Sequence, residues 1–508
     1  MSSQNLRTVI VLAAGEGKRM RSSLPKVLHP VLGRSLLGHV LAAAAQLHAD
    51  RTLVVVGAGA DQVTAHLAEI APKAATVLQG EPRGTGHAVR LALATLPDLT
   101  GTVLVLNGDM PLLRGATLRE FADAHERGGA VASLLSAKLA DPTGLGRILR
   151  DHDGRFTGIV EHRDASPAQR EIDEINAGVY AFDAASLRAQ LARITTDNAQ
   201  GEEYLTDVFG LLIADGQPVT VQPAEQPAET LGCNDRVELA AARAALRDRI
   251  NQDWQRRGVT LIDPATTWID VTVNLGQDAV IEPNTHLRGA TSIGEWASVG
   301  PDVTLIDTEV GAGATVLRAH AVGAEIGPEA IVGPYAYLRP GARLRRRAKV
   351  GTYVEVKQAE LGEGAKVPHL TYVGDATIGP EANIGAGTVF VNYDGVAKHH
   401  TQVGQAAFVG SNSSLVAPVT VGDGAYVAAG SEVTKDVPPG ALAVTRGTQR
   451  NLAGWVPRRR AGTKSARAAE AAQAAETTHP VDATDAARSG IAAVSETTAK
   501  EVPSPHRG

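Results

Sequence analysis

The feature that most constrains the fold is a six-residue repeat that runs from about residue 263 to residue 456. Aliphatic side chains recur at every sixth position, and most of them are followed by glycine or another small or polar residue. These positions are Leu275, Ile281, Leu287, Ile293, Val299, Leu305, Ile326, Val332, Leu338, Leu344, Val350, Val356, Val403, Val409, Leu415, Val421, Val427 and Val433. The repeat predicts a parallel β-helix, in which each six-residue unit supplies one short strand and one corner. Three units close one turn of about 18 residues, and turns stack at about the 4.8 Å spacing of neighbouring strands.

Residues 1–234 follow a different pattern. Apolar runs at 8–12, 53–56 and 102–106 alternate with stretches rich in Ala and Leu that have helical periodicity. This alternation predicts an α/β domain with a mainly parallel sheet. Residues 235–262 form a connecting arm, in which 235–257 have the pattern of one long amphipathic helix. Residues 457–508 are rich in Ala, Thr, Ser, Glu and Pro, and this composition predicts a disordered, dispensable tail.

Composition limits the classes of function. The chain has 508 residues, of which 44% are apolar and 20% charged, as in an ordinary multidomain soluble protein. Its net charge of −6 argues against nucleic-acid binding. The single cysteine, Cys233, excludes an intrachain disulfide framework and fits a reducing compartment. We expect a cytosolic protein with no secretory signal and no membrane span, because no run of about 20 apolar residues occurs.

Residues 11–28, VLAAGEGKRMRSSLPKVL, combine a strand end with a glycine-rich turn. Such a turn directs backbone N–H groups, and the N-terminus of a following helix, toward phosphate oxygens. A tight connection between strand and helix explains the glycines equally well. Arg19 and Lys26 add two cations to the same loop, and Pro25 fixes the backbone just before the lysine. These cations favour a phosphate site.

The segments LAAGEGKRM and LPK resemble the signature loop of sugar-1-phosphate nucleotidyltransferases. Joined to a hexapeptide β-helix, they make residues 5 to about 456 similar to the bacterial bifunctional N-acetylglucosamine-1-phosphate uridylyltransferases and glucosamine-1-phosphate N-acetyltransferases. The resemblance implies an α/β protein, with a Rossmann-like nucleotidyltransferase domain, a helical arm and a left-handed β-helix. It also implies a cytoplasmic homotrimer that uses UTP, glucosamine-1-phosphate, N-acetylglucosamine-1-phosphate and acetyl-CoA to supply cell-wall precursors.

For the first domain, the resemblance implies a uridylyltransferase site. Gly15, Gly17 and Arg19 would wrap the triphosphate, and Lys26 would neutralise charge as pyrophosphate leaves, so that Arg19 and Lys26 are the catalytic cations. The implied substrate contacts are Leu12, Ala13, Ala14, Gly15, Lys26, Gln79, Gly84, Thr85, Gly146, Glu161, Asn176 and Asn234. Two residues depart from the family pattern, namely Lys18, where Thr or Ser is usual, and Asn107, where an aromatic residue is frequent.

A magnesium site is expected in the same domain. Asp109 follows the predicted strand 102–106, and ligands of open α/β sheets bind at the carboxyl ends of strands. A carboxylate there suits Mg²⁺, which prefers oxygen ligands and shares them with substrate phosphates. On local sequence alone, a solvated turn is the simpler interpretation of Asp109. The resemblance implies the metal, with Asn234 as its second protein contact.

The spacing of the repeat predicts a second site. Leu338 and Val356 are separated by three complete units without a break, so Arg339 and Lys357 should stack at one corner on successive turns. Two such cations repel each other unless an anion lies between them, although on the residues alone both could point into water. The resemblance implies that they bind the phosphate of glucosamine-1-phosphate, together with Tyr372 and Asn383. It also implies that His369 is the general base for the attacking amine.

The repeat pauses between Phe390 and Val403, which predicts an inserted loop at residues 391–400. Loops that interrupt a solenoid commonly carry function. The acetyl-CoA contacts that the resemblance implies are Ala386, Asn392, Tyr393, Ser411, Ala429 and Arg446. Arginine suits the phosphates of such a cofactor.

Two alternatives remain open on the sequence. The chain could be a nucleotidyltransferase with one activity, whose β-helix is only an oligomerisation scaffold. It could also be a non-enzymatic sugar-nucleotide-binding regulator. The side chains at Arg339, Lys357 and His369 argue against the scaffold, and Lys26 and Asp109 argue against the regulator.

Overall fold

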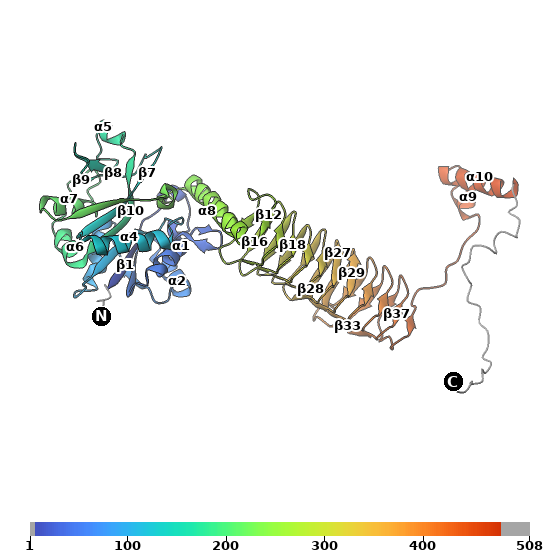
Figure 1. Ribbon diagram of the computed structural model, residues 1–508. Coiled ribbons are helices and arrows are strands. Elements are labelled where there is room, and N and C mark those ends of the chain that lie inside the picture. The colour runs from blue at the N-terminus through green and yellow to red at the C-terminus, as the bar shows by residue number, and fades with distance from the viewer. Residues whose placement is uncertain (1–5, 479–508) are drawn as a thin grey trace, which may run out of the picture. The chain divides into compact units, whose positions relative to one another are not determined.

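The computed structural model describes residues 6–478. The chain divides into two compact units, Met1–Thr445 and Arg446–Gly508, which are described separately. The first unit contains an α/β domain, a long helix and a parallel β-helix (Figure 1). Within residues 6–478, no helix has the length and apolar character needed to cross a membrane.

The α/β domain is built on a mixed, mostly parallel sheet. Its strand order is β11-β7-β10-β6-β1-β4-β5. The bounds are β1 Arg7–Ala13, β4 Arg51–Val56, β5 Ala75–Leu78, β6 Thr102–Asn107, β7 Ala132–Lys138, β10 Glu174–Asp183 and β11 Val219–Pro223. Strand β10 is antiparallel to both of its neighbours, and β8 (Arg147–Arg150) pairs with it and with β9 (Phe156–Val160). The three predicted strands are confirmed as β1, β4 and β6.

Helices cover both faces of this sheet (Figure 1). One face packs against α1 (Leu36–Ala44), α2 (Ala60–Ile70) and α4 (Gly115–Gly128). The other packs against α3 (Thr85–Ala94), α6 (Ala184–Leu191) and α7 (Asp207–Ala214). Because the central strands are buried on both faces, they are continuous aliphatic runs rather than alternating ones. The short elements are η1 Lys18–Met20, η2 Lys26–Leu28, β2 Pro30–Val31, β3 Arg34–Ser35, η3 Ala45–Leu47, α5 Pro167–Arg170 and η4 Pro227–Thr230.

The predicted connecting helix is present as α8 (Arg236–Arg256). The Asp235 carboxylate caps it by accepting hydrogen bonds from the backbone N–H groups of its first turn, which have no partner within the helix. Leu239, Ala242 and Leu246 are buried against the α/β domain. Trp254 packs against the β-helix core. The helix therefore contacts both domains.

The β-helix has three walls of parallel strands, so the predicted architecture is confirmed. One wall consists of β12 Thr260–Leu261, β15 Val280–Ile281, β18 Ser298–Val299, β21 Thr315–Val316, β24 Ile331–Val332, β27 Lys349–Thr352, β29 Lys366–His369, β31 Asn383–Ile384, β34 Phe408–Val409, β37 Tyr426–Val427 and β39 Leu442–Ala443. The other two walls form one continuous sheet of β13 Trp268–Ile269, β14 Asn274–Leu275, β16 Thr285–Arg288, β17 Ser292–Ile293, β19 Val303–Ile306, β20 Glu309–Val310, β22 Ala319–Val322, β23 Glu325–Ile326, β25 Ala336–Leu338, β26 Ala342–Leu344, β28 Glu355–Leu361, β30 Tyr372–Ile378, β32 Val389–Val391, β33 Thr401–Val403, β35 Ser414–Val416, β36 Val419–Val421 and β38 Glu432–Val433.

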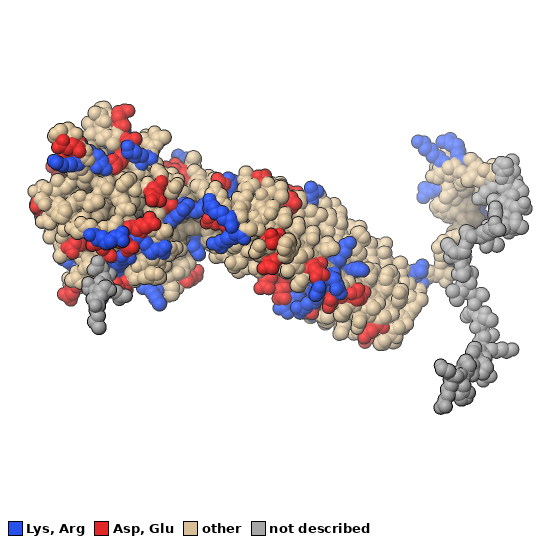
Figure 2. Space-filling model, viewed as in Figure 1, with Lys and Arg blue, Asp and Glu red and all other residues tan. Residues whose placement is uncertain are grey.

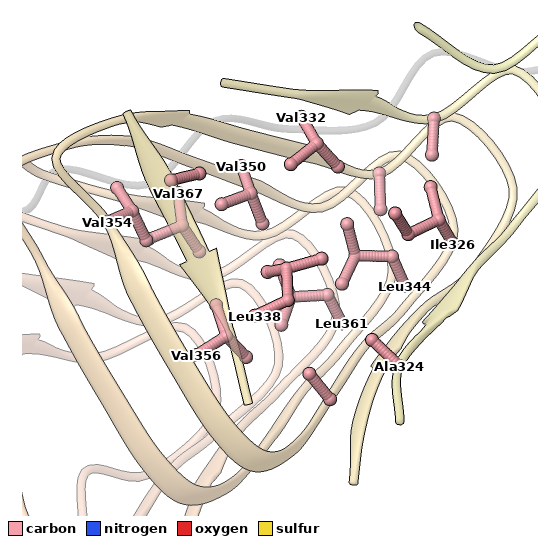
Figure 3. Close-up of a cluster of buried hydrophobic side chains, with 14 of the residues drawn as sticks. Ala324, Ile326, Val332, Leu338, Leu344, Val350, Val354, Val356, Leu361 and Val367 are labelled. Carbon is pink, nitrogen blue, oxygen red and sulfur yellow. The ribbon is translucent and has the colours of Figure 1, made fainter. Parts of the chain in front are cut away.

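The aliphatic positions of the repeat fill the interior of these coils. All of them are buried and belong to one hydrophobic cluster. Figure 3 shows a part of this cluster, in which Leu338, Leu344, Val350 and Val356 point toward one another. Leu338 pairs with Val356 on the next coil, as the spacing predicts.

The coil length changes at the predicted insertion. Ala376 pairs in register with Thr401, and Lys357 pairs in register with Gly374. The coil between the first two residues is the longer one, and its additional residues form the loop between β32 and β33. An isolated bridge between Tyr393 and Lys398 closes this loop upon itself.

Ion pairs between neighbouring coils cover part of the β-helix surface. Figure 2 shows Lys and Arg side chains next to Asp and Glu side chains there. The pairs include Arg343 with Glu325 at 3.0 Å and Arg347 with Glu363 at 3.0 Å. All four side chains are about half exposed, so each pair contributes little to stability. The buried aliphatic cluster is the main source of stability.

The described part of the second unit, residues 446–478, contains the helices α9 (Trp455–Arg459) and α10 (Lys464–Thr478). The helix α10 differs from the expectation that residues 457–508 lack regular structure. That expectation considered only how much apolar surface the segment could bury, whereas its many alanines have the highest intrinsic helix propensity. Residues 479–508 of the expected tail lie outside the described residues.

We predict that Leu338→Ala lowers the free energy of unfolding by about 2–5 kcal/mol, because it leaves a cavity in the fully buried interior of the β-helix. Denaturant unfolding at one fixed protein concentration measures this. The matched control is Leu442→Ala in the same β-helix, where the side chain is 65% exposed and the loss should be below about 0.5 kcal/mol. Equal losses in the two variants would contradict the assignment of the core.

Candidate active sites

The first candidate site is a cavity of about 550 Å³ at the carboxyl ends of β1 and β6. Nine of the residues expected from the sequence line it, namely Leu12, Ala13, Ala14, Gly15, Lys26, Gln79, Gly84, Thr85 and Asp109. Glu16, Lys18, Val27, Pro82, Ala88, Asn107 and Glu202 complete the lining. The volume is within the range of about 300–1,000 Å³ that is usual for small-molecule sites.

The glycine-rich loop after β1 folds tightly over the lysine turn. Gly17 has a φ of 60°, a left-handed conformation that glycine adopts without strain. A Cβ atom at Gly17 would lie 2.6 Å from the Cβ of Lys26. Gly17 is therefore required both for the backbone conformation and for the close approach to Lys26.

Lys26 lies between two oxygen ligands. Its ammonium group forms an ion pair with the Asp109 carboxylate and donates a hydrogen bond of 3.3 Å to the Oδ1 atom of Asn234. The segment that carries Asn234 is held beside Asp109, because the backbone N–H of Cys233 donates a hydrogen bond of 3.0 Å to the Asp109 carbonyl. The structure thus brings together three expected residues from positions 26, 109 and 234.

The donor set suits a hard cation. Asp109 offers a carboxylate and Asn234 an amide oxygen, and both already face a positive charge. Two protein oxygens, with the remaining positions left to water and phosphate, are typical of Mg²⁺ bound beside a nucleotide. The neighbouring thiol is unsuited to metal binding, because burial and the charge of Asp109 raise the pKa of Cys233 to about 12.

One end of the cavity has polar groups that suit a nucleobase edge. Gln79 is buried, and its Nε2 donates to the carbonyl of Gly84 at 3.0 Å and lies 3.2 Å from His87 Nδ1. Gly84 has a φ of 104°, and a Cβ there would lie 2.5 Å from the carbonyl oxygen of Glu203. Thr85 fixes the same segment, because its hydroxyl accepts a hydrogen bond of 3.0 Å from the backbone N–H of Leu205.

A second group of expected residues meets on β8, β9 and β10. Gly146 lies against Glu161, since a Cβ at Gly146 would be 3.3 Å from the Glu161 Oε2 atom. The carbonyl of Gly146 accepts a hydrogen bond of 2.9 Å from the Asn176 N–H, and Asn176 Nδ2 donates to the hydroxyl of Tyr180 at 2.8 Å. The register of β10 shifts between Asn176 and Tyr180, and such a bulge changes the direction of a side chain.

Glu161 is the electrostatically unusual member of this group. Burial raises its pKa, the hydrogen bond that its Oε1 accepts from Thr206 at 3.0 Å lowers it in part, and the charges of Asp207 and Asp164 raise it further. No cation pairs with Glu161 within residues 6–478. Its free acceptor capacity suits neutral donors such as sugar hydroxyl or amide groups.

Three positions that the sequence singles out, Lys18, Arg19 and Asn107, differ in their surroundings. Lys18 lines the cavity and forms an ion pair with Glu16 at 2.5 Å. Arg19 is exposed in the same turn and does not line the cavity. Asn107 lines the cavity, and a Cβ at Gly178 would collide with its side-chain amide, so Gly178 leaves the space that Asn107 occupies.

The second candidate site lies on the β-helix. Arg339 and Lys357 follow Leu338 and Val356, which pair in register, so the two cations occupy equivalent places on neighbouring coils. Arg339 donates a hydrogen bond of 2.9 Å to the Glu355 carboxylate, which raises the pKa of Arg339. Lys357 lies 3.5 Å from the Asp375 carboxylate.

Polar groups from the inserted loop reach the same place. Asn392 is buried, and its amide donates to Asp375 and, at 3.4 Å, to the hydroxyl of Tyr372. Lys398 lies beside Lys357, and the close approach of the Lys357 amino group and its positive charge lower the pKa of Lys398. The loop therefore adds one amide and one cation to the Arg339 and Lys357 corner.

His369 ends β29 on the coil that follows Lys357. Its ring is exposed and makes no hydrogen bond within residues 6–478, while its carbonyl accepts hydrogen bonds from the Thr371 hydroxyl at 2.6 Å and from the Gly387 N–H at 3.4 Å. The backbone is thus fixed and the ring is available to a substrate. Asn383 pairs in register with Lys366 one coil further along.

Three expected cofactor contacts form a column of small residues. The backbone N–H of Asn412 donates to the carbonyl of Ala386, and that of Gly430 donates to the carbonyl of Ser411, each at 2.8 Å. Gly385 and Gly410 lie directly before two of these positions, and a Cβ on Gly410 would be 2.4 Å from the backbone nitrogen of Ala429. Close backbone packing therefore joins these three positions on neighbouring coils. Tyr393 is 57% exposed on the loop, whereas Arg446 belongs to the second unit and its contact with a cofactor stays a prediction.

The comparisons with known proteins agree with this architecture. Residues 9–207 match the family described as MobA-like NTP transferase domain, and residues 400–435 match the bacterial transferase hexapeptide family. The chain is 57% identical over 471 residues to a protein of Streptomyces avermitilis named "Bifunctional protein GlmU", with 92% of this chain and 98% of that protein aligned. Proteins with the same name from Thermobifida fusca and Mycolicibacterium vanbaalenii are 58% and 53% identical, with 92% and 90% of this chain and 98% and 94% of the relatives aligned. The chain belongs to the GlmU family.

Sequence reasoning missed several residues around the two sites of this GlmU family member. These are His87, Thr206, Glu355, Asp375 and Lys398. Glu355 and Asp375 could have been found from the strand register, since each lies about one coil along the chain from its partner, Arg339 or Lys357. No signal in the sequence points to His87 or Thr206, because they meet their partners through tertiary packing.

We predict that Gly17→Ala lowers kcat/KM for uridylyl transfer by about 100-fold, because the methyl group displaces Lys26 and such small displacements are costly. Acetyl transfer by the same preparation should be unchanged. The control is Gly80→Ala near the same cavity, where a Cβ meets nothing within 4 Å. Equal effects of the two substitutions on pyrophosphate release would contradict this role of Gly17.

We predict that Glu161→Gln raises the melting temperature at pH 7.5 and that this gain shrinks as the pH falls toward 4. Because the pKa of Glu161 is raised in the folded state, its carboxyl group contributes stability only while it is protonated, and this contribution is lost as the pH rises through the folded-state pKa. Glutamine stays neutral at every pH, so the variant does not lose this stability at pH 7.5. Thermal unfolding between pH 4 and pH 8 measures it, with exposed Glu69→Gln as control, and a difference that is independent of pH would contradict the role of burial.

Proposed function

We propose that this chain synthesises UDP-N-acetylglucosamine at two separate sites. The β-helix site transfers acetyl from acetyl-CoA to glucosamine-1-phosphate. The α/β site then transfers UMP from UTP to the N-acetylglucosamine-1-phosphate so formed and releases pyrophosphate. The observation that carries this proposal is that each domain brings two cations together at a candidate site, Lys18 and Lys26 in the cavity of one and Arg339 and Lys357 on neighbouring coils of the other.

In the acetyl-transfer site, Arg339 and Lys357 bind the sugar phosphate. In the free protein both cations contact carboxylates, so the phosphate exchanges with, or adds to, the contacts of Glu355 and Asp375. Tyr372 and Asn383 hold the amino sugar. Asn392 and Tyr393, with the small-residue column of Ala386, Ser411 and Ala429, hold acetyl-CoA.

His369 acts as the general base. The amine nitrogen of the sugar attacks the thioester carbonyl carbon and loses a proton to the imidazole. The C–S bond breaks, and the departing CoA thiolate takes that proton from the imidazolium and leaves as the thiol. An imidazole serves this step because its ordinary pKa is close to neutral pH. Its exposed ring and fixed backbone are suited to the role.

In the uridylyl-transfer site, no protein nucleophile is required. A phosphate oxygen of N-acetylglucosamine-1-phosphate attacks the α-phosphorus of UTP, and the bond to the β-phosphate oxygen breaks. Lys26 stabilises the charge that develops on the phosphates from within the cavity, Arg19 does so from the exposed turn beside it, and the loop at Gly15 orients the phosphates. Gln79 and Gly84 read the uracil edge, whereas Glu161, Asn176 and Gly146 hold the sugar. Mg²⁺, held by Asp109 and Asn234, would supply further charge neutralisation when it is bound.

The location and assembly of the protein are also proposals. We place it in the cytoplasm, where UTP and acetyl-CoA are available, and its single buried thiol is compatible with that compartment. We propose that it acts as a homotrimer through its β-helix, since exposed aromatic side chains such as Tyr335 and Tyr353 stack on each other along this surface. The scaffold alternative explains the β-helix but gives no role to Arg339, Lys357 or His369.

The proposal is tested by two assays on one protein preparation. CoA release is followed with glucosamine-1-phosphate and acetyl-CoA, and pyrophosphate release with UTP and N-acetylglucosamine-1-phosphate. His369→Ala should lower only CoA release and Asp109→Ala only pyrophosphate release, each by about 100-fold or more. The two variants control each other, because each must retain the activity that the other loses.

Wild-type protein without CoA release would establish the scaffold alternative. Loss of both activities in either variant, with unfolding excluded by circular dichroism, would contradict the separation of the sites.

A further inference from the structure

A second, larger cavity lies in the α/β domain, at the opposite end of the strands from the nucleotide site. Its volume is about 870 Å³, and it opens between α1 and α2 beside the start of β4. Three small residues at α1 and its end, namely Gly38, Ala42 and Ala45, leave the space that larger side chains would fill. None of the residues assigned above to substrates or metal lines this cavity.

The cavity is mostly apolar, and three exposed cations at its edge form no ion pair within residues 6–478. These cations are Arg34, Arg51 and Lys73. The single carboxylate in the lining, Asp50, already accepts a hydrogen bond of 2.9 Å from the backbone N–H of Arg7. Several other cations of this domain form ion pairs, for example Arg90 with Glu203 at 2.6 Å. The excess of positive charge favours an anionic ligand.

A fixed pair of hydrogen-bonding groups also lines the cavity. The Ser35 Oγ atom is 2.8 Å from the Nε2 atom of His66 and accepts a hydrogen bond of 2.9 Å from the N–H of Gly38. Ser35 is 6% exposed, so its position is set by packing. A few fixed polar groups on an apolar wall are the usual composition of a small-molecule site.

One turn of the chain separates this cavity from the nucleotide site. In the 3₁₀ turn Lys26–Leu28, Leu28 lines the larger cavity, whereas Lys26 and Val27 line the nucleotide cavity. The start of α2 touches the same segment, because a Cβ at Gly59 would lie 2.5 Å from Pro25. A ligand that separates α1 from α2 would therefore move the turn that carries Lys26.

We propose that this cavity is an effector site for a small organic anion with an apolar body, such as an aryl or acyl group bearing a sulfonate, carboxylate or phosphate. The apolar body occupies the space between α1 and α2, and the anionic group meets Arg34, Arg51 and Lys73. Occupancy alters uridylyl transfer through the Lys26–Leu28 turn and leaves acetyl transfer unchanged.

Binding is tested on the full chain with 1-anilinonaphthalene-8-sulfonate, an aromatic anion whose fluorescence rises in apolar surroundings. Ala42→Phe fills the cavity and should weaken binding about tenfold or more. The matched control is Ala68→Phe on the exposed side of α2, which does not line the cavity and should bind as wild type does.

The charge requirement is tested separately, which keeps the proposal falsifiable if Ala42→Phe fails to fold. The double substitution Arg34→Gln and Arg51→Gln should weaken binding of the sulfonate about tenfold. It should leave binding of the neutral analogue N-phenyl-1-naphthylamine within about twofold. Equal affinity of the sulfonate for wild type, for the Ala42→Phe variant and for this double variant would overturn the site.

The effect of the larger cavity on the nucleotide site is tested with the same sulfonate probe. At saturation the sulfonate should change KM for UTP in the pyrophosphate-release assay by about fivefold or more, since coupling free energies between sites typically correspond to factors of about 5–150. CoA release is the internal control and should not change. Binding of the probe at this cavity with unchanged UTP kinetics would overturn the effector role. The fluorescence measurement of binding does not depend on either proposed reaction, so a failure of the cavity proposal can be distinguished from a failure of the proposed function.

Discussion

Strand register is the constraint on which the β-helix site depends. Backbone hydrogen bonds join each coil to the next, and the buried aliphatic residues hold that register because a shift by one residue would turn them toward solvent. Residues one coil apart along the chain therefore become neighbours in space. Arg339 meets Glu355 and Lys357 meets Asp375 in this way, on a part of the surface where like charges would otherwise repel each other.

The α/β domain also brings residues that are far apart in the chain to one site, but by the arrangement of its parallel strands. Parallel strands end at one edge of the sheet, so the loops after β1 and β6 converge although they are far apart in the chain. Lys26, Asp109 and Asn234 meet there, and Gly17 makes the approach of the loop to Lys26 sterically feasible. The same turn also contributes Leu28 to the wall of the larger cavity, so that one turn touches the cavities at both ends of the strands.

The sequence predicts the framework well because periodic burial leaves a periodic pattern. The aliphatic positions, the one-coil step from Leu338 to Val356 and the pause after Phe390 all follow from that pattern. Contacts that depend on side-chain conformation leave no such pattern. The sequence therefore does not indicate that Thr206 reaches Glu161, that His87 lies beside Gln79, or that Asn392 bridges Tyr372 and Asp375. Helix α10 differs for another reason, since local alanine propensity forms it without a buried core.

The central claim is that one chain carries two anion-binding sites, one at Lys26 and one at Arg339 and Lys357. The most direct measurement is a crystal structure of the protein with UDP-N-acetylglucosamine, glucosamine-1-phosphate and CoA bound. We expect density for the diphosphate beside Lys26 and Asp109, and density for the sugar phosphate in contact with both Arg339 and Lys357. Density for either phosphate group well away from these side chains would show that the anions bind elsewhere on the chain.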